Sequence, residues 1–367
     1  MVQPDLTPPA EAAEEENWFE RISLNADLRL RHESQFLETS AGDVPDRQRQ
    51  RIRFRIGGKM HVLKNLDIGF RLVTGATDTT IMGVTGTGGA DPVSSNQTLG
   101  NTFETKGFQL DRAYAAYQYG PGKFLGGKFE NPFYTTQVIW DSDVSVEGLA
   151  QQFRFKATDR TEVFVTLGQF FIEELPADEQ DTYLLALQAG VEQKLGDAMT
   201  AKLALAYYDY GNIRGRTLTH ATSGNTLGFG AEQNDYDILD ILGEVTFDLG
   251  VPVKLLGQYV NNIDVASGNK QNTATHFGIV VGNKPRKLGD WRVRYSYRVV
   301  AADAVVDAFT HSDFHGGGTN SRGSEMGVDI GLAQGVALNF TYYNTQVETG
   351  LKGDRQRFQA DLVIKFM

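Results

Sequence analysis

The sequence contains no cysteine, so neither disulfides nor thiolate metal sites are available to it. It also lacks any run of about 18 apolar residues, which excludes a membrane-spanning helix of ordinary length. Only 10 prolines interrupt the 367 residues, and no linker or shift in composition divides them. A single large domain is therefore expected. The mean hydropathy of −0.32 is a value expected for a soluble protein. Membrane strands that alternate apolar and polar residues, however, average to similar values.

The formal net charge of −11 argues against nucleic acid as a partner. Part of this charge comes from Glu11, Glu14, Glu15 and Glu16 near the start of the chain. Because residues 1–17 offer no apolar core, we expect a flexible acidic N-terminal segment, either a mature terminus or a cloning remnant, from which an export signal peptide has already been removed. The domain would then occupy residues 18–367.

The clearest pattern lies in residues 47–62. Arginine occurs at every second position from Arg47 to Arg55, and Ile52, Phe54 and Ile56 occupy alternate positions. In an extended strand this places cations on one face and apolar side chains on the other. If the apolar face meets lipid, each arginine turned outward at mid-membrane would cost about 2–4 kcal/mol. The arginines are therefore expected to face a wet lumen.

The same alternation recurs along the chain and predicts about sixteen strands, joined alternately by short turns and by long polar loops such as 34–46 and 77–106. The predicted strands are 21–31, 47–62, 66–72, 107–119, 123–130, 149–156, 163–167, 183–191, 199–208, 239–249, 253–265, 275–282, 291–299, 326–332, 336–342 and 358–366. Strand 107–119 fits two phases equally well. An even number of strands places both chain ends on the turn side. This regularity indicates an all-β fold, a closed transmembrane antiparallel β-barrel, rather than an open sandwich.

A second arginine series, Arg292, Arg294 and Arg298, alternates with apolar residues in strand 291–299. For both series the simplest interpretation is a hydrated lumen wall without a selective role. Tuning of the channel is favoured over it, because lumen charges are the usual determinants of selectivity.

Several segments resemble the bacterial outer-membrane family called putative porins, within the wider group of sixteen-stranded trimeric porins. They are Leu110–Tyr114, Gly127–Phe133, Trp140–Asp143 with Glu147–Gly148, Gly289–Tyr297, and Ser312–Asn320. The resemblance implies a homotrimer in outer-membrane lipid and lipopolysaccharide that passes small hydrophilic solutes or ions by diffusion. The chain departs from the pattern at its end, where Phe366 is followed by Met367 instead of closing on an aromatic residue.

In such porins the third loop folds into the lumen, and the corresponding residues here are 131–147, which include Trp140, Asp141, Asp143 and Glu147. The resemblance thus implies loop carboxylates opposite a wall of arginines. The pattern of the strands supplies that wall as Arg49, Arg51, Arg53 and Arg55, joined by Arg29, Arg31 and Arg71 of neighbouring strands. Opposed charges across a narrow wet neck would create a transverse field that orients dipolar solutes.

No set of residues suggests covalent chemistry, a cofactor or a dedicated metal site. The acidic residues from Asp141 to Glu147 resemble a calcium loop only weakly, because Val146 stands where such loops need glycine. The run His315-Gly-Gly-Gly resembles a lipase oxyanion turn, but no Gly-x-Ser-x-Gly accompanies it, so a flexible loop is expected there. Three alternatives to a general diffusion channel stay open: a channel selective for anions such as phosphate or organic acids, a barrel enzyme, and a structural barrel.

Overall fold

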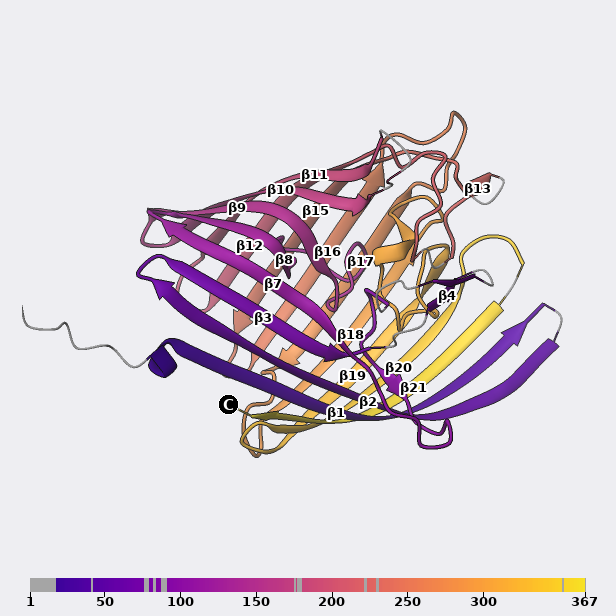
Figure 1. Cartoon of the computed structure of the whole chain (residues 1–367), viewed down its shortest axis with the longest axis horizontal. Coiled ribbons are helices and arrows are strands. Elements are labelled where there is room, and N and C mark those ends of the chain that lie inside the picture. The colour runs from indigo at the N-terminus through magenta and orange to yellow at the C-terminus, as the bar shows by residue number, and fades with distance from the viewer. Residues whose placement is uncertain are drawn as a thin grey trace, which may run out of the picture.

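The structure, a computed structural model, describes residues 18–40, 42–75, 79–81, 84–86, 91–174, 176, 180–220, 223–228, 231–351 and 353–366. The predicted flexible segment 1–17 and Met367 lie outside the described residues. Within these residues the main sheet has 17 strands, all paired antiparallel, of which the two-residue β6 (Gln97–Thr98) belongs to a loop. The other sixteen form a closed barrel, as predicted (Figure 1).

The barrel strands are β1 (Ile22–Thr39), β2 (Gly42–Leu63), β3 (Leu66–Thr74), β7 (Phe108–Tyr119), β8 (Gly122–Glu130), β9 (Ser145–Thr158), β10 (Thr161–Glu173), β11 (Thr182–Lys194), β12 (Met199–Gly211), β15 (Tyr236–Asp248), β16 (Pro252–Asn262), β17 (Thr273–Gly282), β18 (Trp291–Val300), β19 (Ser321–Ala333), β20 (Val336–Val347) and β21 (Gly353–Phe366). The loops carry β4 (Thr79–Ile81), β5 (Val84–Gly86), β13 (Leu227–Gly228) and β14 (Ala231–Glu232).

The barrel closes where the first strand meets the last. β1 pairs with β21 from Ala26 opposite Phe366 to Thr39 opposite Gly353. In Figure 1 the short helix η1 (Trp18–Arg21) and the C-terminus lie at the left, near the short turns, whereas β4 and β13 lie with the loops at the right. Both described chain ends are therefore on the turn side, as an even strand number requires.

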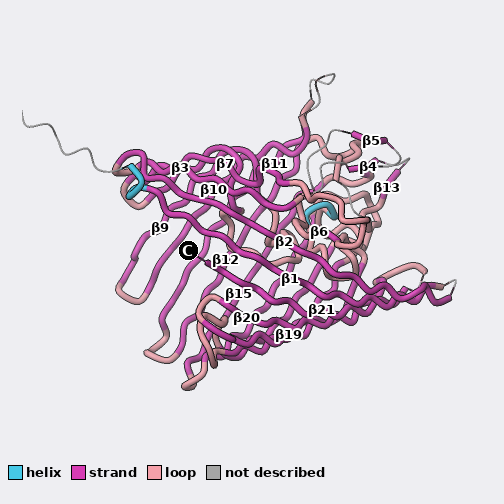
Figure 2. The backbone as a smooth tube through the Cα atoms, turned by 60° about the horizontal axis from the view of Figure 1, so that its bottom comes forward, coloured by secondary structure: helices cyan, strands magenta, loops and turns pink. Residues whose placement is uncertain are grey.

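Apolar side chains predicted to point outward are exposed on the barrel surface. Leu24, Ile68, Leu167, Leu187 and Ile241 each keep 40–48% of their surface accessible. Burying them against a lipid bilayer is what makes such a strand pattern stable. The helical content of the described residues is confined to η1 and η2 (Asp307–Phe309), the two short cyan turns in Figure 2. Neither is long and apolar enough to cross a membrane.

The prediction of a polar loop at residues 34–46 is wrong. β1 continues to Thr39 and β2 begins at Gly42, so that most of this segment is a strand pair with only two residues between. Its ladder continues through polar residues, for example Gln35 opposite Arg47. Pairing outside an apolar band needs no apolar alternation, and the sequence pattern therefore stops before the strand does.

The ambiguous strand β7 contains a β-bulge. Arg71 of β3 pairs with Arg112, and the next residue, Leu72, pairs with Leu110, which leaves Asp111 as the extra residue. A bulge shifts the alternation by one position. Leu110 therefore points outward before the bulge, at 58% exposure, and Tyr117 points outward after it, at 47%.

One side of the barrel interior is filled by an apolar core. Inward-facing residues of β8 to β17, such as Phe129, Leu184 and Tyr208, pack against loop residues such as Val138 and Val305. The opposite wall, formed by β1, β2, β3 and β21, keeps its charged side chains. Any water-filled path must therefore follow the charged side.

Candidate functional site

The third long loop, residues 131–144 and here called L3, lies inside the barrel. Gln188 on β11 holds Tyr134 with two hydrogen bonds, accepting from its backbone N–H at 2.8 Å and donating to its carbonyl at 2.7 Å. The Thr136 hydroxyl donates to Gln258 on β16, and Gln152 on β9 donates to the Pro132 carbonyl at 2.9 Å. These partners are inward-facing residues of three strands, so the loop is seated on the inner wall.

Asp143 connects L3 to the arginine wall. Its carboxylate lies 2.7 Å from the Arg55 guanidinium of β2. Burial opposes ionisation of this carboxyl, but Arg55, followed by Arg53 and Arg29, holds the pKa of Asp143 well below its usual range. Asp143 is thus a charged loop residue facing the predicted wall.

Trp140 and Asp141 have packing contacts that the sequence did not predict. Trp140 belongs to the apolar core and stacks on Phe309 with ring centroids 5.1 Å apart. Asp141 is 4% exposed and accepts backbone N–H bonds from Asp143 and Ser312, each at 2.9 Å. Burial raises the pKa of this carboxyl. Both residues join L3 to the loop between β18 and β19, which contains Phe309 and Ser312.

Glu147 lines the same polar cavity as Asp143 but has a different ion-pair partner. β9 begins at Ser145, so L3 ends before the predicted boundary at 147. Glu147 pairs with Lys128 on β8 and is exposed. Because Asp143 pairs with Arg55 and Glu147 with Lys128, the two carboxylates do not converge as calcium ligands would.

The arginines of β1 and β2 stand directly opposite one another. Arg29 pairs in register with Arg53, and Arg31 with Arg51. Like charges in directly opposed positions destabilise a sheet unless counter-charges reach them. Arg53 pairs with Asp27 of β1 at 2.7 Å. Arg29, Arg31 and Arg51 have partners on β1 and on other elements.

Glu33 is the buried counter-charge of Arg49, Arg51 and Arg31. It is fully buried and pairs with Arg49, with Arg51 at 3.8 Å and with Arg31 at 3.9 Å. Gln359 of β21 donates to it at 2.9 Å. One carboxylate therefore serves three arginines.

A second loop segment, from the 75–107 loop here called L2, also lies on the wall. The Asn96 side chain accepts from Arg29 at 2.5 Å, and its carbonyl accepts from Arg51 at 3.2 Å. Ser95 accepts from Arg55 at 2.9 Å. Nothing in the sequence pattern predicted these contacts, because Ser and Asn are ordinary loop residues.

Arg71 and the second arginine series sit at other places. Arg71 on β3 pairs with Asp111, the bulged residue of β7. On β18, Arg292 and Arg294 pair with Asp329 of β19, at 2.5 and 2.7 Å, and Arg298 pairs with Glu325 at 2.6 Å. The second series therefore has its counter-charges on the neighbouring strand β19 and does not pair with the L3 carboxylates.

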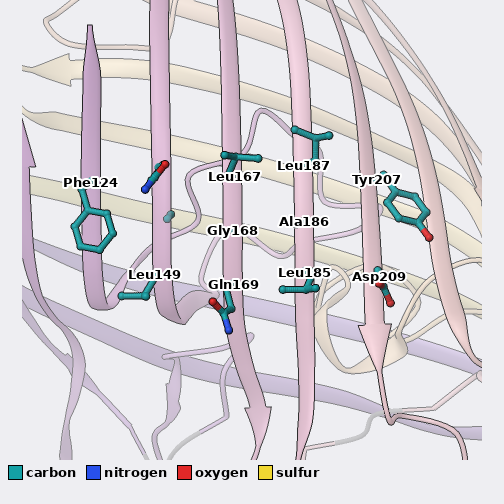
Figure 3. A pocket seen from close by; sticks show the side chains of 12 residues that line it. Phe124, Leu149, Leu167, Gly168, Gln169, Leu185, Ala186, Leu187, Tyr207 and Asp209 are labelled. Carbon is teal, nitrogen blue, oxygen red and sulfur yellow. The ribbon is translucent and has the colours of Figure 1, made fainter. Parts of the chain in front are cut away.

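The cavity nearest to the Asp143 contact has a volume of about 350 Å³ and is lined by polar residues, among them Arg55, Ser95, Asp111 and Asp143. A larger hollow of about 540 Å³ lies on the outer surface, lined by exposed leucines such as Leu149, Leu167 and Leu187 (Figure 3). The outer hollow is a depression in the apolar belt, so the polar cavity is the better candidate for solute contact.

Comparisons with known proteins agree with the barrel fold. A family model described as "Putative porin" matches residues 41–238 and 236–366. No curated protein matches the chain.

Among solved structures, OprB of Pseudomonas putida has a TM-score of 0.59 at 10% identity, covering 95% of each chain. The OmpF of Salmonella typhi, solved with daunomycin, has a TM-score of 0.54 at 10% identity, covering 94% of this chain and 97% of the other. A triple mutant of the Rhodopseudomonas blastica porin has a TM-score of 0.51 at 13% identity, covering 94% of this chain and 100% of that chain. At these identities the likeness is one of fold.

Proposed function

Because the chain belongs to the family of putative porins, we propose that it is a bacterial outer-membrane channel for small hydrophilic solutes and ions, narrowed where L3 meets the arginine wall. Membership of this family supports the general activity, which is the passage of solutes through a water-filled barrel. The narrowing at L3, the part played by the arginines and the preference for one sign of charge are the proposal.

The contact between Asp143 and Arg55, at 2.7 Å, is the observation that carries the proposal. It joins an inward-folded loop to the charged wall, at the edge of a polar cavity. Fixed opposite charges beside a water-filled path create a local field, and this field favours polar solutes over apolar ones.

A preference for anions is the finer part of the proposal. Among the described residues, no hydrogen-bond partner reaches the Nε atoms of Arg29, Arg51 and Arg53. These buried atoms belong to a wall where one buried carboxylate, Glu33, serves three arginines. The excess of positive charge on this wall would attract a passing carboxylate or phosphate.

Assembly as a homotrimer in contact with outer-membrane lipid and lipopolysaccharide is part of the same proposal. The exposed apolar surface of the barrel supports contact with lipid. Export would require a signal peptide ahead of the mature chain.

The test is single-channel recording in a planar bilayer under a salt gradient, with wild type and with the double variant Arg51→Ser, Arg53→Ser. The proposal predicts discrete conductance for both, and a reversal potential that shifts toward cation preference in the variant. Wild type without conductance would overturn the channel, and a variant with an unchanged reversal potential would overturn the arginine wall as the selective element.

A further inference from the structure

A second loop, residues 301–320 between β18 and β19 and here called L7, folds into the same lumen. Its Asp313 carboxylate bridges two arginines of the charged wall, with Arg31 of β1 at 2.8 Å and Arg357 of β21 at 2.7 Å. Both guanidinium side chains are only 5% exposed. The loop therefore reaches from its own strands, β18 and β19, to the wall beyond β20.

L7 is joined to L3 along a continuous seam. The Asp141 backbone N–H donates to the Phe309 carbonyl at 2.6 Å, and the Ser312 N–H donates to the Asp141 carboxylate at 2.9 Å. The His311 N–H donates to the Gln137 carbonyl at 3.2 Å. Together with the stacking of Trp140 on Phe309, these contacts make the two loops one inner layer.

L7 is also held by residues that lie outside the charged wall. The Arg298 guanidinium lies 4.2 Å over the Phe314 ring, and Asn225 donates to the carbonyls of Ala302 and Val305 at 2.7 and 2.8 Å. Gly318 adopts a φ of 84° where it packs on the Ser223 backbone, and a Cβ there would collide with that carbonyl. Asp313 is thus presented to the wall by a loop held at both ends.

Charge at the tip of L7 is complementary to the wall. Burial alone would raise the pKa of Asp313, but Arg31 and Arg357 hold it well below its usual range, so the residue is a carboxylate at neutral pH. Asp143 meets the wall at Arg55, whereas Asp313 meets it at Arg31, which stands opposite Arg51. L3 and L7 therefore each place one carboxylate against a different arginine of the wall.

We propose that L7 is a second constriction loop and that Asp313 is a selectivity-determining residue, limiting the anion preference that the arginine wall would otherwise produce. This inference rests on the proposed channel function. Removing the carboxylate leaves Arg31 and Arg357 with one counter-charge fewer beside the ion path, which favours anions.

The experiment compares Asp313→Asn with wild type and with Asp197→Asn, the same substitution at a turn residue that is fully exposed. Reversal potentials are measured in planar bilayers under a salt gradient. We expect the anion-to-cation permeability ratio to rise about fivefold in Asp313→Asn, the size that one unit charge at contact distance produces in a water-like dielectric. Asp197→Asn is expected to match wild type.

A second variant guards against misfolding. Because the chain has no cysteine, Asp313→Cys can be folded first and then modified in the bilayer by a sulfonate-bearing methanethiosulfonate. We expect the modification to lower the raised anion preference again, and a trimethylammonium-bearing reagent to raise it further. A thiol that neither reagent reaches, or selectivity that follows neither charge, overturns the role of Asp313. Wild type without conductance defeats the channel function itself, whereas conducting wild type with indifferent variants defeats only this inference.

Discussion

Arg31 illustrates how a charge is accommodated inside this barrel. Its guanidinium makes two hydrogen bonds to Asp361, at 2.6 and 2.8 Å, and a third contact to Asp313. Such fork-shaped pairing is stronger than a single point contact. The alternation of the sequence placed Arg31 on the inner face, but its partners come from residues more than 280 positions away.

Glu33 should be the most sensitive carboxylate of the wall. In Glu33→Gln the arginines around it, Arg49 and Arg51 above all, lose their buried counter-charge, and we expect the free energy of unfolding to fall by about 3–5 kcal/mol. Denaturant titration of the protein in detergent micelles measures this loss. Glu38→Gln, at an exposed position of the same strand, is the control and should change stability little. Equal stabilities for the two variants would contradict the prediction.

His311 should make the stability of L7 depend on pH. Burial, with Arg298, lowers its pKa to about 4, and Glu325, Asp313 and Arg357 also face it. The unfolded chain, in which histidine titrates near about 6.5, therefore binds the proton first. Stability should be unaffected above that pH and should fall as pH drops toward about 4, by up to about 3 kcal/mol.

The measurement is the difference in unfolding free energy between wild type and His311→Gln at a series of pH values. The difference should shrink as pH falls through this window, because the variant lacks the titrating ring. Parallel curves for the two proteins would show that His311 does not carry the effect.

At the scale of elements, β7 shows why the inward-facing and outward-facing residues of one strand could not be told apart from the sequence. Its two candidate phases are both present, one on each side of the bulge at Asp111. The bulge also lets Asp111 reach Arg71 on β3. An alternation that fits two phases is thus a signal for a bulge in strands of this kind.

The glycine run of L7 has a structural role that sequence alone hid. Gly316, Gly317 and Gly318 have φ values of 95°, 94° and 84°, a region that favours glycine. The sequence suggested a flexible loop, whereas Gly318 is packed against Ser223 and Gly317 is buried. The run allows a sharp turn inside a packed layer.

L3 should be released from β11 by Gln188→Ala. The substitution removes both hydrogen bonds to Tyr134 in a fully buried setting. We expect stability to fall by about 1–3 kcal/mol, together with a larger or noisier single-channel conductance. Gln193→Ala, near the turn end of the same strand, is the matched control. Unchanged conductance in Gln188→Ala would show that this clamp does not set the channel width.

At the scale of the whole molecule, the barrel is divided along its length. Charged residues line the β1, β2, β3 and β21 side, while the side from β8 to β17 encloses an apolar core filled by L3 and L7. Strands of the filled side carry apolar residues on both faces, as in Leu184 with Leu185. In the proposed channel, the water path would therefore run beside the arginines.

The outer surface should tolerate arginine far less than the lumen. Leu205, exposed on the outer face of β12, is a candidate for Leu205→Arg, and Lys202→Arg introduces the same side chain on the inner face of that strand. We expect Leu205→Arg to cost about 2–4 kcal/mol in a bilayer and Lys202→Arg to be nearly neutral. Folding titrations into lipid vesicles compare the two, and equal costs would contradict the assignment of the faces.

The sequence by itself determined the barrel, the number of its strands, the side on which its ends lie and the inner face of the arginines. Each of these depends on a period of two along a strand, or on the alternation of turns and loops, and both are local properties. Where the pattern weakened, at 34–46 and in β7, the strand continued because backbone pairing does not require apolar side chains.

Tertiary structure decided which residues meet inside. Loop composition does not encode direction, so the inward fold of L7, the packing of Trp140 and the pairing of Asp313 with Arg31 and Arg357 had no signal in the sequence pattern. The resemblance to porins suggested L3, but the companion loop emerged only from contacts between distant segments. The barrel follows from local alternation, whereas its interior follows from the need to give buried charges and apolar surfaces partners from distant segments.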